Sequence, residues 1–433
     1  MDILTANDQI GQYPNSWYAA TAPELAGWDA AKGNMTCDVC IVGAGFTGLS
    51  AAVHLADRGY DVILLDAHRV GFGASGRNGG QVGTGQRVDQ RVLERMVGVE
   101  HARALWELAL DGVQLVRDLI DQNSMDCGFA EGIIHADHRA RLVPESRASA
   151  EHLRDVYGYE KIRALERDEM RQLVGTDAYF GGTLDTGGGH IHPLRLAFGL
   201  ARLAAKRGVR IFERYKVVEV VKTTPAIVRT EYSEIRAAHV VLACNGYLGG
   251  LNAQVARRVM PINNFIVATE PLGDTAAKAL IRNNHAVADS KFVINYFRLS
   301  NDNRLLFGGG ESYGYRFPRD ISAVVRKPML EIFPHLKDTK IDYSWGGTLA
   351  ITMNRMPHFA RIRGNILSAS GYSGHGVALA TLGGKIAAEA IAGQAERFDL
   401  MASVPTPSFP GGVALRWPLL VLAMVWFSLR DRL

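Results

Sequence analysis

The stretch from Val39 to Gly48 reads Val-Cys-Ile-Val-Gly-Ala-Gly-Phe-Thr-Gly, an apolar run that leads directly into three spaced glycines. These glycines, Gly43, Gly45 and Gly48, form the pattern G-x-G-x-x-G. The residues that follow predict a helix over 49–55 and a second strand over 62–65, which ends at Asp66. A strand, a glycine turn, a helix, a second strand and a terminal acid within one short unit are typical of a dinucleotide-binding fold.

Each part of this unit has a physical role. Gly43 permits the tight turn, Gly45 lets the backbone approach a pyrophosphate, and Gly48 allows close packing of helix and strand. The start of the helix offers unpaired N–H groups and the positive end of a dipole. Asp66 is placed to accept hydrogen bonds from ribose hydroxyls.

A second glycine-dense stretch, Gly71–Gly80, reads Gly-Phe-Gly-Ala-Ser-Gly-Arg-Asn-Gly-Gly. It offers backbone donors and the cation of Arg77 to a long phosphate-bearing ligand. The chain carries a single complete fingerprint, whereas enzymes that reduce a flavin with NAD(P)H often carry two. A flavin reduced directly by the substrate is therefore favoured; the alternative for this stretch is a mobile loop.

Composition sets the broad class. A length of 433 residues suits two domains, and a net charge of +4 without a block of basic residues does not indicate nucleic-acid binding. Four cysteines make no disulfide framework, and no secretory signal opens the chain, which favours a cytoplasmic location. Cys37 and Cys40 form a CxxC pair, but they lie in the first predicted strand and are expected to be buried rather than redox-active.

The glycine motif, Asp66 and the 73–80 loop resemble the D-amino-acid-oxidase/sarcosine-oxidase class of FAD-dependent oxidoreductases. Segments 240–246 and 371–376, with the helix at 383–389, are similar to the later cofactor-binding segments of that class. Residues 16–21 and 416–420 narrow the resemblance to the bacterial gamma-glutamylputrescine oxidase branch. The resemblance implies an α/β chain (α+β overall), with a Rossmann-like FAD-binding domain and a second, mainly antiparallel-sheet substrate domain.

The resemblance also implies a set of cofactor-binding residues. They are Gly43, Gly45, Phe46, Thr47, Gly48, Asp66, Ala67, Arg69, Gly73, Ala74, Ser75, Arg77, Asn78, Gly79, Gly80, Val218, Cys244, Asn245, Gly246, Gly371, Ser373, Gly374, His375 and Gly376. No metal site is expected, because His, Cys and carboxylates show no ligand spacing.

The predicted domains are discontinuous. Residues 37–91, 188–250 and 345–396 are assigned to the FAD-binding domain, and 92–187 and 251–344 to the substrate domain. Residues 1–36 form an N-terminal extension, and 397–433 form a C-terminal segment with an apolar helix. Apolar spacing predicts helices over 91–123 and 193–207, and strands over 128–136, 179–184, 209–212, 216–222, 226–230, 240–243, 262–269, 292–299 and 304–308.

His375 is the side chain most expected beside the flavin, with a backbone-bonded loop residue as the alternative. Tyr372 and Trp345 are further candidate catalytic groups, and Tyr296 and Tyr313 are candidate pocket walls; ordinary core packing is the alternative for each. Two carboxylates that could attract a cationic polyamine end are Glu270 and Glu311, with a solvated or paired role as the alternative.

Two departures from the wider class bear on the cofactor and the electron acceptor. Relatives that tether their flavin use a cysteine in the segment that aligns with 348–357, and this segment has none here, so noncovalent FAD is expected. Relatives also carry an oxygen-activating lysine on the strand that aligns with 304–308, where this chain has none. Dioxygen or a quinone therefore stays open as the acceptor.

The run from Trp417 to Leu429 is apolar but too short to span a bilayer comfortably. It is expected to dock on the protein, with a peripheral contact to the inner face of the membrane as the alternative.

The resulting hypothesis is FAD-dependent oxidative deamination of a small-molecule amine, a gamma-glutamylated polyamine such as gamma-glutamylputrescine, giving an imine and then an aldehyde. One alternative is an amino-acid or N-methyl-amino-acid oxidase acting on glycine, sarcosine or a proline-like substrate, for which Arg298 or Arg355 could bind a carboxylate. Others are a membrane-associated dehydrogenase that feeds quinone and a noncatalytic flavoprotein subunit. The oligomeric state stays open.

Overall fold

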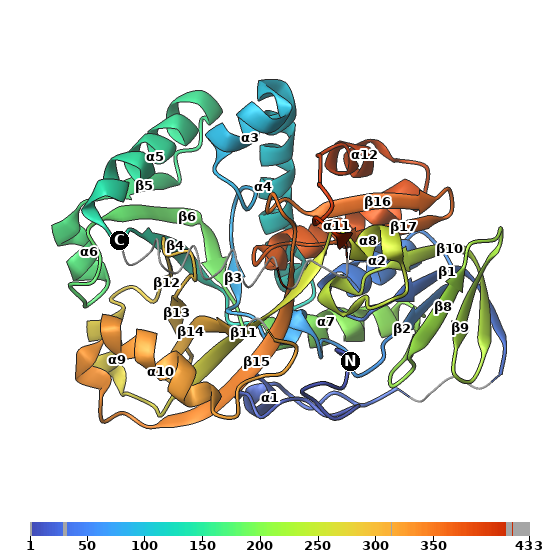
Figure 1. The fold of residues 1–433 in the computed structure, drawn as a ribbon, viewed down its shortest axis with the longest axis horizontal. Coiled ribbons are helices and arrows are strands. Elements are labelled where there is room, and N and C mark those ends of the chain that lie inside the picture. The colour runs from blue at the N-terminus through green and yellow to red at the C-terminus, as the bar shows by residue number, and fades with distance from the viewer. Residues whose placement is uncertain (1, 29–32, 313, 413–417, 419–433) are drawn as a thin grey trace.

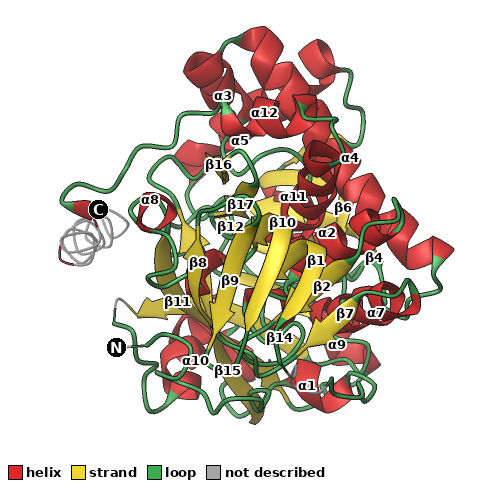
Figure 2. Ribbon diagram, turned by 90° about the vertical axis from the view of Figure 1, so that its right-hand side faces the viewer, coloured by secondary structure: helices red, strands yellow, loops and turns green. Residues whose placement is uncertain are grey.

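The computed structural model describes residues 2–28, 33–312, 314–412 and 418. Within these residues the chain forms two large β-sheets with helices packed against them (Figures 1 and 2). This mixed α/β architecture confirms the predicted fold class.

The first sheet is built around the strand that precedes the glycine motif. β1 (Met35–Val42) lies between β2 (Val62–Leu65) and β10 (Glu234–Leu242) and runs parallel to both, as Figure 2 shows. The last residues of these three strands lie opposite one another, so their carboxyl ends meet at one edge. The sheet continues with β7 (Arg210–Phe212) beside β2, with β17 (Ile366–Ser370) and β16 (His358–Arg363) beyond β10, and with β9 (Ala226–Thr230) and β8 (Val217–Val221) as an antiparallel extension.

Both faces of this sheet are covered. Val39 and Ile41 of β1 point into the cluster that contains the helices, while Cys40 and Val42 point into a cluster with the β8–β9 ribbon. The main covering helices are α2 (Phe46–Ala56), α4 (Val99–Gln122), α7 (Pro193–Lys206) and α11 (Gly376–Ile391). α2 and α11 pack so closely that a Cβ on Gly384 would lie 2.2 Å from the Thr47 carbonyl oxygen.

The second sheet is mainly antiparallel, as the sequence predicts. Its pairings are antiparallel except that β4 and β12 are parallel. In spatial order it contains β15 (Ile341–Ile351), β11 (Met260–Thr269), β14 (Leu305–Ser312), β13 (Tyr296–Leu299), β12 (Ala286–Asp289), β4 (Ala130–Ala136), β6 (Gly182–His190) and β3 (Gln81–Val82), with β5 (Ile162–Leu165) beside β6. Its core is shared with α6 (Arg167–Leu173), α9 (Asp274–Leu280) and α10 (Ile321–Ile332).

Several shorter elements complete the chain. They are α1 (Trp17–Thr21), α3 (Gln90–Val97), α5 (Val143–Tyr157), α8 (Ala253–Ala256), α12 (Glu396–Ala402) and the 3₁₀ turns Ala74–Gly76, Ala140–Leu142, Asn245–Tyr247 and Pro334–Leu336.

Several local predictions differ from the structure. The single helix expected over 91–123 is broken into α3 and α4 at Gly98, which adopts φ +87°. The strand expected over 292–299 begins only at Tyr296, because the Asp289 carboxylate accepts hydrogen bonds from the N–H groups of Lys291 and Asn295 and closes a turn there. The strand expected over 179–184 is β6, which starts at Gly182 and runs on to His190. Helices α5 and α10 were not predicted, since α5 buries few apolar side chains and α10 contains an internal proline.

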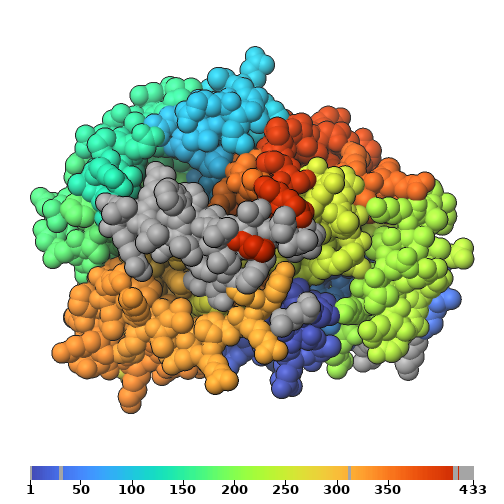
Figure 3. Space-filling view, in the orientation of Figure 1, coloured from blue at the N-terminus to red at the C-terminus, as the bar shows by residue number. Residues whose placement is uncertain are grey.

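The N-terminal segment ties the two sheet regions together. Asn7 donates to the Tyr315 carbonyl oxygen (2.7 Å), and Lys216 near the start of β8 pairs with Asp2. Figure 3 shows this dark blue segment on the surface between the orange and the yellow-green parts of the chain.

Within the described ranges, no helix is both long enough and apolar enough to cross a membrane. Apart from Pro418, the apolar run 417–429 lies outside the described residues, so its predicted docking is not addressed by the structure.

Candidate active site

The glycine turn has the geometry that its motif predicts. Gly43 adopts φ +107°, which disfavours any side chain, and a Cβ on Gly48 would lie 1.8 Å from the Gly43 carbonyl oxygen. Gly45 is the N-cap of α2 and supplies no side-chain cap, and the Phe46 N–H donates to Ser75 Oγ, so the remaining backbone N–H groups of the first turn are available to an anion.

Asp66 lies where the carboxyl ends of the parallel strands meet. Its two carboxylate oxygens accept from the backbone N–H groups of Ala44 (2.8 Å) and His68 (2.7 Å). Burial raises the pKa of Asp66 to about 6 in spite of these hydrogen bonds. Each oxygen keeps a second lone pair, so the held carboxylate still has acceptor capacity for ribose hydroxyls.

Two cavities lie at this edge. The smaller, about 110 Å³, is bordered by Asp66 and by Gly43, Ala67, Val217 and Cys244; the larger, about 590 Å³, reaches to His375. Five residues line both cavities, namely Gly45, Ala74, Ser75, Ala243 and Asn245. A continuous path thus runs from the Asp66 carboxylate, past Gly45 and the start of α2, into the larger cavity. This shape and these donors fit an extended FAD molecule.

The 73–80 loop is held in place by its own side chains. The Asn78 amide donates to the carbonyl oxygens of Ala74 (2.9 Å) and Ser75 (3.0 Å), and its oxygen accepts from the Gly80 N–H (2.7 Å). Ser75 Oγ accepts from the Phe46 N–H at the start of α2 (2.9 Å). The loop is therefore fixed against the glycine turn.

Arg77 lines the larger cavity but is anchored on the protein itself. Its guanidinium donates to the carbonyl oxygens of Phe72 (2.6 Å) and Gly346 (3.0 Å) and pairs with Asp8 of the N-terminal segment (3.1 Å). This buried cation was expected to face phosphate, whereas three of its described contacts are with other parts of the chain. Its Nη2 is buried and has no hydrogen-bond partner among the described residues.

The 371–376 segment closes the larger cavity from the side of α11. Ser373 adopts φ +53° and Gly374 φ +85°, and the Tyr372 hydroxyl shares a hydrogen bond with Thr47 Oγ1 (2.7 Å). The first residues of α2 and of α11 both line the cavity. The positive ends of two helix dipoles thus face one volume, which favours anionic groups there.

His375 lies in the cavity wall as a neutral imidazole. Its Nε2 lies 3.1 Å from the Thr84 carbonyl oxygen and 3.2 Å from that of Gly85, so Nε2 carries the proton and Nδ1 is an acceptor. Burial lowers the pKa of His375 to about 4, and the nearby charges of Arg87 and His135 act in the same direction.

The predicted site residues divide between cavity walls and supporting positions. Tyr372 and Tyr296 line the larger cavity with His375. Trp345 does not line it; its ring is buried, and its Nε1 donates to the Arg77 carbonyl oxygen (3.1 Å) beneath the loop. Tyr313 and the Glu311 side chain fall outside the described residues.

Several residues that were predicted to bind the cofactor line neither of the two cavities. Arg69 bonds to Glu213 and to the Leu25 carbonyl oxygen, and Val218 is 48% exposed on β8 while its neighbour Val217 lines the smaller cavity. Predicted cofactor positions that line neither cavity are Gly48, Arg69, Gly80, Val218, Gly246 and Gly371.

Arg298, proposed as a carboxylate receptor, is also engaged elsewhere. It donates to the carbonyl oxygens of Gly79, Ile191 and Leu299 and to the Tyr18 hydroxyl, and it does not line the larger cavity. Arg355, the other candidate, does line the cavity.

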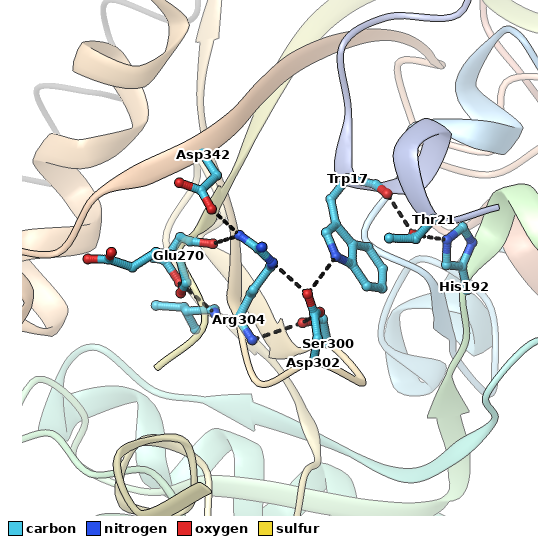
Figure 4. A network of polar contacts seen from close by, with 10 residues as sticks. Trp17, Thr21, His192, Glu270, Ser300, Asp302, Arg304 and Asp342 are labelled. Carbon is cyan, nitrogen blue, oxygen red and sulfur yellow. Dashed lines mark hydrogen bonds and ion pairs between the residues drawn. The ribbon is translucent and has the colours of Figure 1, made fainter. Parts of the chain in front are cut away.

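Figure 4 shows the positions of two further residues from the sequence analysis, Arg304 and Glu270. Arg304 pairs with Asp302 and Asp342. The Glu270 carboxylate accepts from the Lys340 N–H (2.9 Å). Neither Arg304 nor Glu270 lines the larger cavity. Arg304, which directly precedes β14, is thus part of a structural network that also includes Trp17.

Sequence reasoning missed several charged groups in the cavity wall, among them Arg87, His135, Asp137, Asp289 and Lys291. No motif surrounds them, because they come from strand ends and turns that are distant in sequence. The one local signal is the spacing of His135 and Asp137, which are two positions apart at the end of β4 and both line the cavity.

The comparisons with known proteins agree with this geometry. The family model described as DAO, FAD dependent oxidoreductase, matches residues 38–390. The chain is 41% identical over 426 residues to the gamma-glutamylputrescine oxidoreductase of Escherichia coli (strain K12), covering 98% of this chain and 99% of that protein. It is 42% identical over 418 residues to a probable oxidoreductase OrdL of Rhizobium meliloti (strain 1021), covering 96% and 97%.

The fold is similar to the crystal structure of glycine oxidase from Geobacillus kaustophilus, with a TM-score of 0.72, 22% identity, and 86% of this chain and 99% of that chain covered. The fingerprint, the paired cavities and these matches together place the chain in the DAO family of FAD-dependent oxidoreductases.

Proposed function

We propose that the chain oxidises the terminal amine of a gamma-glutamylated polyamine such as gamma-glutamylputrescine, with FAD bound noncovalently. The single observation that carries this proposal is the near full-length similarity to the E. coli gamma-glutamylputrescine oxidoreductase. The amine loses two electrons and two protons to become an imine, and water then converts the imine to an aldehyde with release of ammonia.

Bound FAD supplies the two-electron acceptor for oxidation of the carbon next to the amine nitrogen. The amine must be neutral to be oxidised. His375 is too weak a base, with a pKa of about 4, to take a proton from an ammonium group. Its Nδ1 instead accepts a hydrogen bond from the neutral amine and orients it, while the positive charges in the wall disfavour the ammonium form.

Noncovalent attachment is supported by the positions of the cysteines. Residues 348–357 contain no cysteine, and the free cysteines are Cys37, Cys40, Cys127 and Cys244. None of these lines the larger cavity. Acid precipitation of purified holoenzyme is expected to release the flavin into the supernatant; flavin that stays in the pellet would overturn this part of the proposal.

We infer that dioxygen accepts the electrons without help from the 304–308 strand, where Arg304 is committed to its ion pairs. A quinone is the competing acceptor. Stopped-flow reoxidation of the reduced enzyme by air-saturated buffer and by a soluble quinone analogue compares the two. A large advantage for the quinone would replace the oxidase assignment with a dehydrogenase assignment.

An amino-acid or N-methyl-amino-acid oxidase is the second candidate, favoured by Arg355 in the cavity wall and by the likeness in fold to glycine oxidase. Anaerobic mixing of the holoenzyme with gamma-glutamylputrescine, glycine, sarcosine and proline separates the candidates. Rapid bleaching of the flavin by gamma-glutamylputrescine is expected. Bleaching by an amino acid instead would select the second candidate, and no bleaching by any amine would contradict both.

A further inference from the structure

Arg87 is a half-buried cation in the wall of the larger cavity. Its Nε donates to the Ser373 carbonyl oxygen (3.3 Å). In the part of the chain that the structure describes, Arg87 has no ion-pair partner. Burial and, to a smaller extent, the charge of Arg355 lower the pKa of its guanidinium to about 10, and the group stays cationic near neutral pH.

Arg355 brings a second guanidinium to the same cavity at a cost in backbone strain. It adopts φ +65°, a left-handed conformation that is uncommon for a residue with a side chain. The turn that imposes this conformation is held by the Arg355 N–H to the Thr352 carbonyl oxygen (3.2 Å) and by Thr352 Oγ1 to the Met356 carbonyl oxygen (2.7 Å). Two guanidinium groups that line one cavity repel each other unless an anion lies between them, and backbone strain is typical of functional sites. Arg87 and Arg355 are therefore expected to bind an anion.

The same cavity also contains a carboxylate with unused acceptor capacity. Asp137 directly follows β4, is 3% exposed, and has an Oδ2 atom without a hydrogen-bond partner among the described residues. Burial raises the pKa of Asp137, and the hydroxyls of Ser146 and Ser290 only partly oppose this. A buried acceptor without a hydrogen-bond partner destabilises the protein, so binding of a cationic group that donates a hydrogen bond to Asp137 Oδ2 is favoured.

His135 lines the same cavity. It is the penultimate residue of β4, two positions before Asp137, and its pKa is lowered by burial and by the charge of Arg87. Arg87, His135 and Asp137 therefore share one cavity, and the charge of Arg87 acts on His135 there.

We propose that Arg87, with Arg355, binds the carboxylate and Asp137 binds the ammonium of an α-amino-acid group at the far end of the amine substrate. This inference rests on the proposed function and names what the enzyme recognises beyond the reacting amine. A gamma-glutamyl group carries both charges, whereas free putrescine offers only a second ammonium, which can pair with Asp137 but leaves the two guanidiniums without an anion. The receptor thus selects gamma-glutamylated polyamines over free ones.

Three substrates that differ only in this group test the proposal on the holoenzyme. Gamma-glutamylputrescine carries both charges, N-glutarylputrescine carries the carboxylate alone, and N-acetylputrescine carries neither. In the wild type, kcat/KM is expected to fall along this series, by on the order of tenfold to a hundredfold for the carboxylate. The change should lie mainly in KM, because the group is remote from the reacting carbon.

Two substitutions test the guanidinium and the carboxylate of this receptor separately. Arg87→Gln is expected to reduce the preference for N-glutarylputrescine over N-acetylputrescine to within about threefold, and Arg87→Lys to restore part of it. Asp137→Asn should instead reduce the preference for gamma-glutamylputrescine over N-glutarylputrescine. Arg361→Gln, which removes a surface arginine paired with Asp399, is the matched control and should change neither preference.

A binding measurement keeps this inference distinct from the proposed function. Gamma-glutamylbutylamide lacks the terminal amine, so its effect on the flavin spectrum reports binding without turnover. Wild-type binding that is lost in Arg87→Gln, without flavin reduction by any amine, would support the receptor and overturn the amine oxidase. Unchanged binding in a folded Arg87 variant, or an equal loss for all three substrates with loss of FAD, would overturn the receptor and make Arg87 a cofactor contact.

Discussion

Replacement of Gly45 by valine is expected to separate cofactor binding from folding. Gly45 borders both cavities at the point where they meet, and its own backbone is extended, with φ −87° and ψ −173°. Valine adopts this conformation readily, so the substitution introduces no backbone strain. Its effect must come from the atoms that it adds.

The magnitude follows from two contacts. An added Cβ would lie 2.9 Å from Ser75 Oγ, which must move and lose the hydrogen bond from the Phe46 N–H, at a cost of about 0.5–1.5 kcal/mol in folding free energy. The valine methyl groups also displace a pyrophosphate from the start of α2. Loss of two charge-assisted hydrogen bonds there amounts to about 3–6 kcal/mol, on the order of a hundredfold to ten-thousandfold in the dissociation constant of FAD.

Titration of apoprotein with FAD, followed by flavin fluorescence, measures this dissociation constant, and thermal unfolding of the apoprotein measures stability. Ser75→Ala removes the hydrogen bond alone, and Gly364→Val adds the same side chain where nothing lies within 4 Å of the new Cβ. Both controls should keep most of their FAD affinity. A folded Gly45→Val protein with wild-type FAD affinity would refute the placement of the phosphates beside Gly45.

Three further predictions concern buried polar groups. Arg77→Ala leaves Asp8 without its buried partner and is expected to destabilise the protein by about 3–5 kcal/mol and to expose the N-terminal segment to limited proteolysis; cleavage at the wild-type rate would contradict the anchoring role. Tyr372→Phe removes the hydrogen bond to Thr47 and should cost about 0.5–1.5 kcal/mol in urea unfolding, with FAD retained, whereas an apoprotein would show that this hydroxyl contacts the cofactor. Stability should fall between pH 7 and pH 5, because histidines whose folded pKa lies below 6.5 bind more protons when unfolded, each contributing up to about 1.4 kcal/mol per pH unit. The histidines concerned are His54, His358 and His375 (about 4), His190 (about 3) and His192 (about 2), and they outnumber Asp66 and Asp289, whose pKa values are raised to about 6 and which act in the opposite direction. Urea unfolding across this range tests the sign, and a stability that rises on acidification would refute it.

The elements that the sequence predicted well are those whose signal is local. Helix 193–207 was predicted from a proline at its start and a glycine after its end, and the structure has α7 over Pro193–Lys206. By contrast, the strand over 292–299 was overpredicted, because the side chain of Asp289 caps the backbone of the following turn. Apolar periodicity carries no information about such a bond.

The sequence by itself determined the dinucleotide turn of this protein. Gly43 adopts a positive φ, and Gly48 lies so close to the Gly43 carbonyl oxygen that a side chain would not fit. Asp66 directly follows the second strand, and the length of one βαβ unit sets its distance from these glycines. These requirements act between residues that are close in the chain, so the residue types alone reveal them.

Only the tertiary structure decided which charges share the larger cavity. Arg87 and Asp137 come from segments separated by 50 positions, and Arg355 lies more than 200 positions further on; the second sheet and the start of α11 bring them together. The structure likewise gave Arg77 an ion pair with Asp8 and placed Trp345 beneath the loop rather than in the cavity wall. Long-range packing determines such placements, because the direction of a side chain depends on the sheet or helix against which its segment packs.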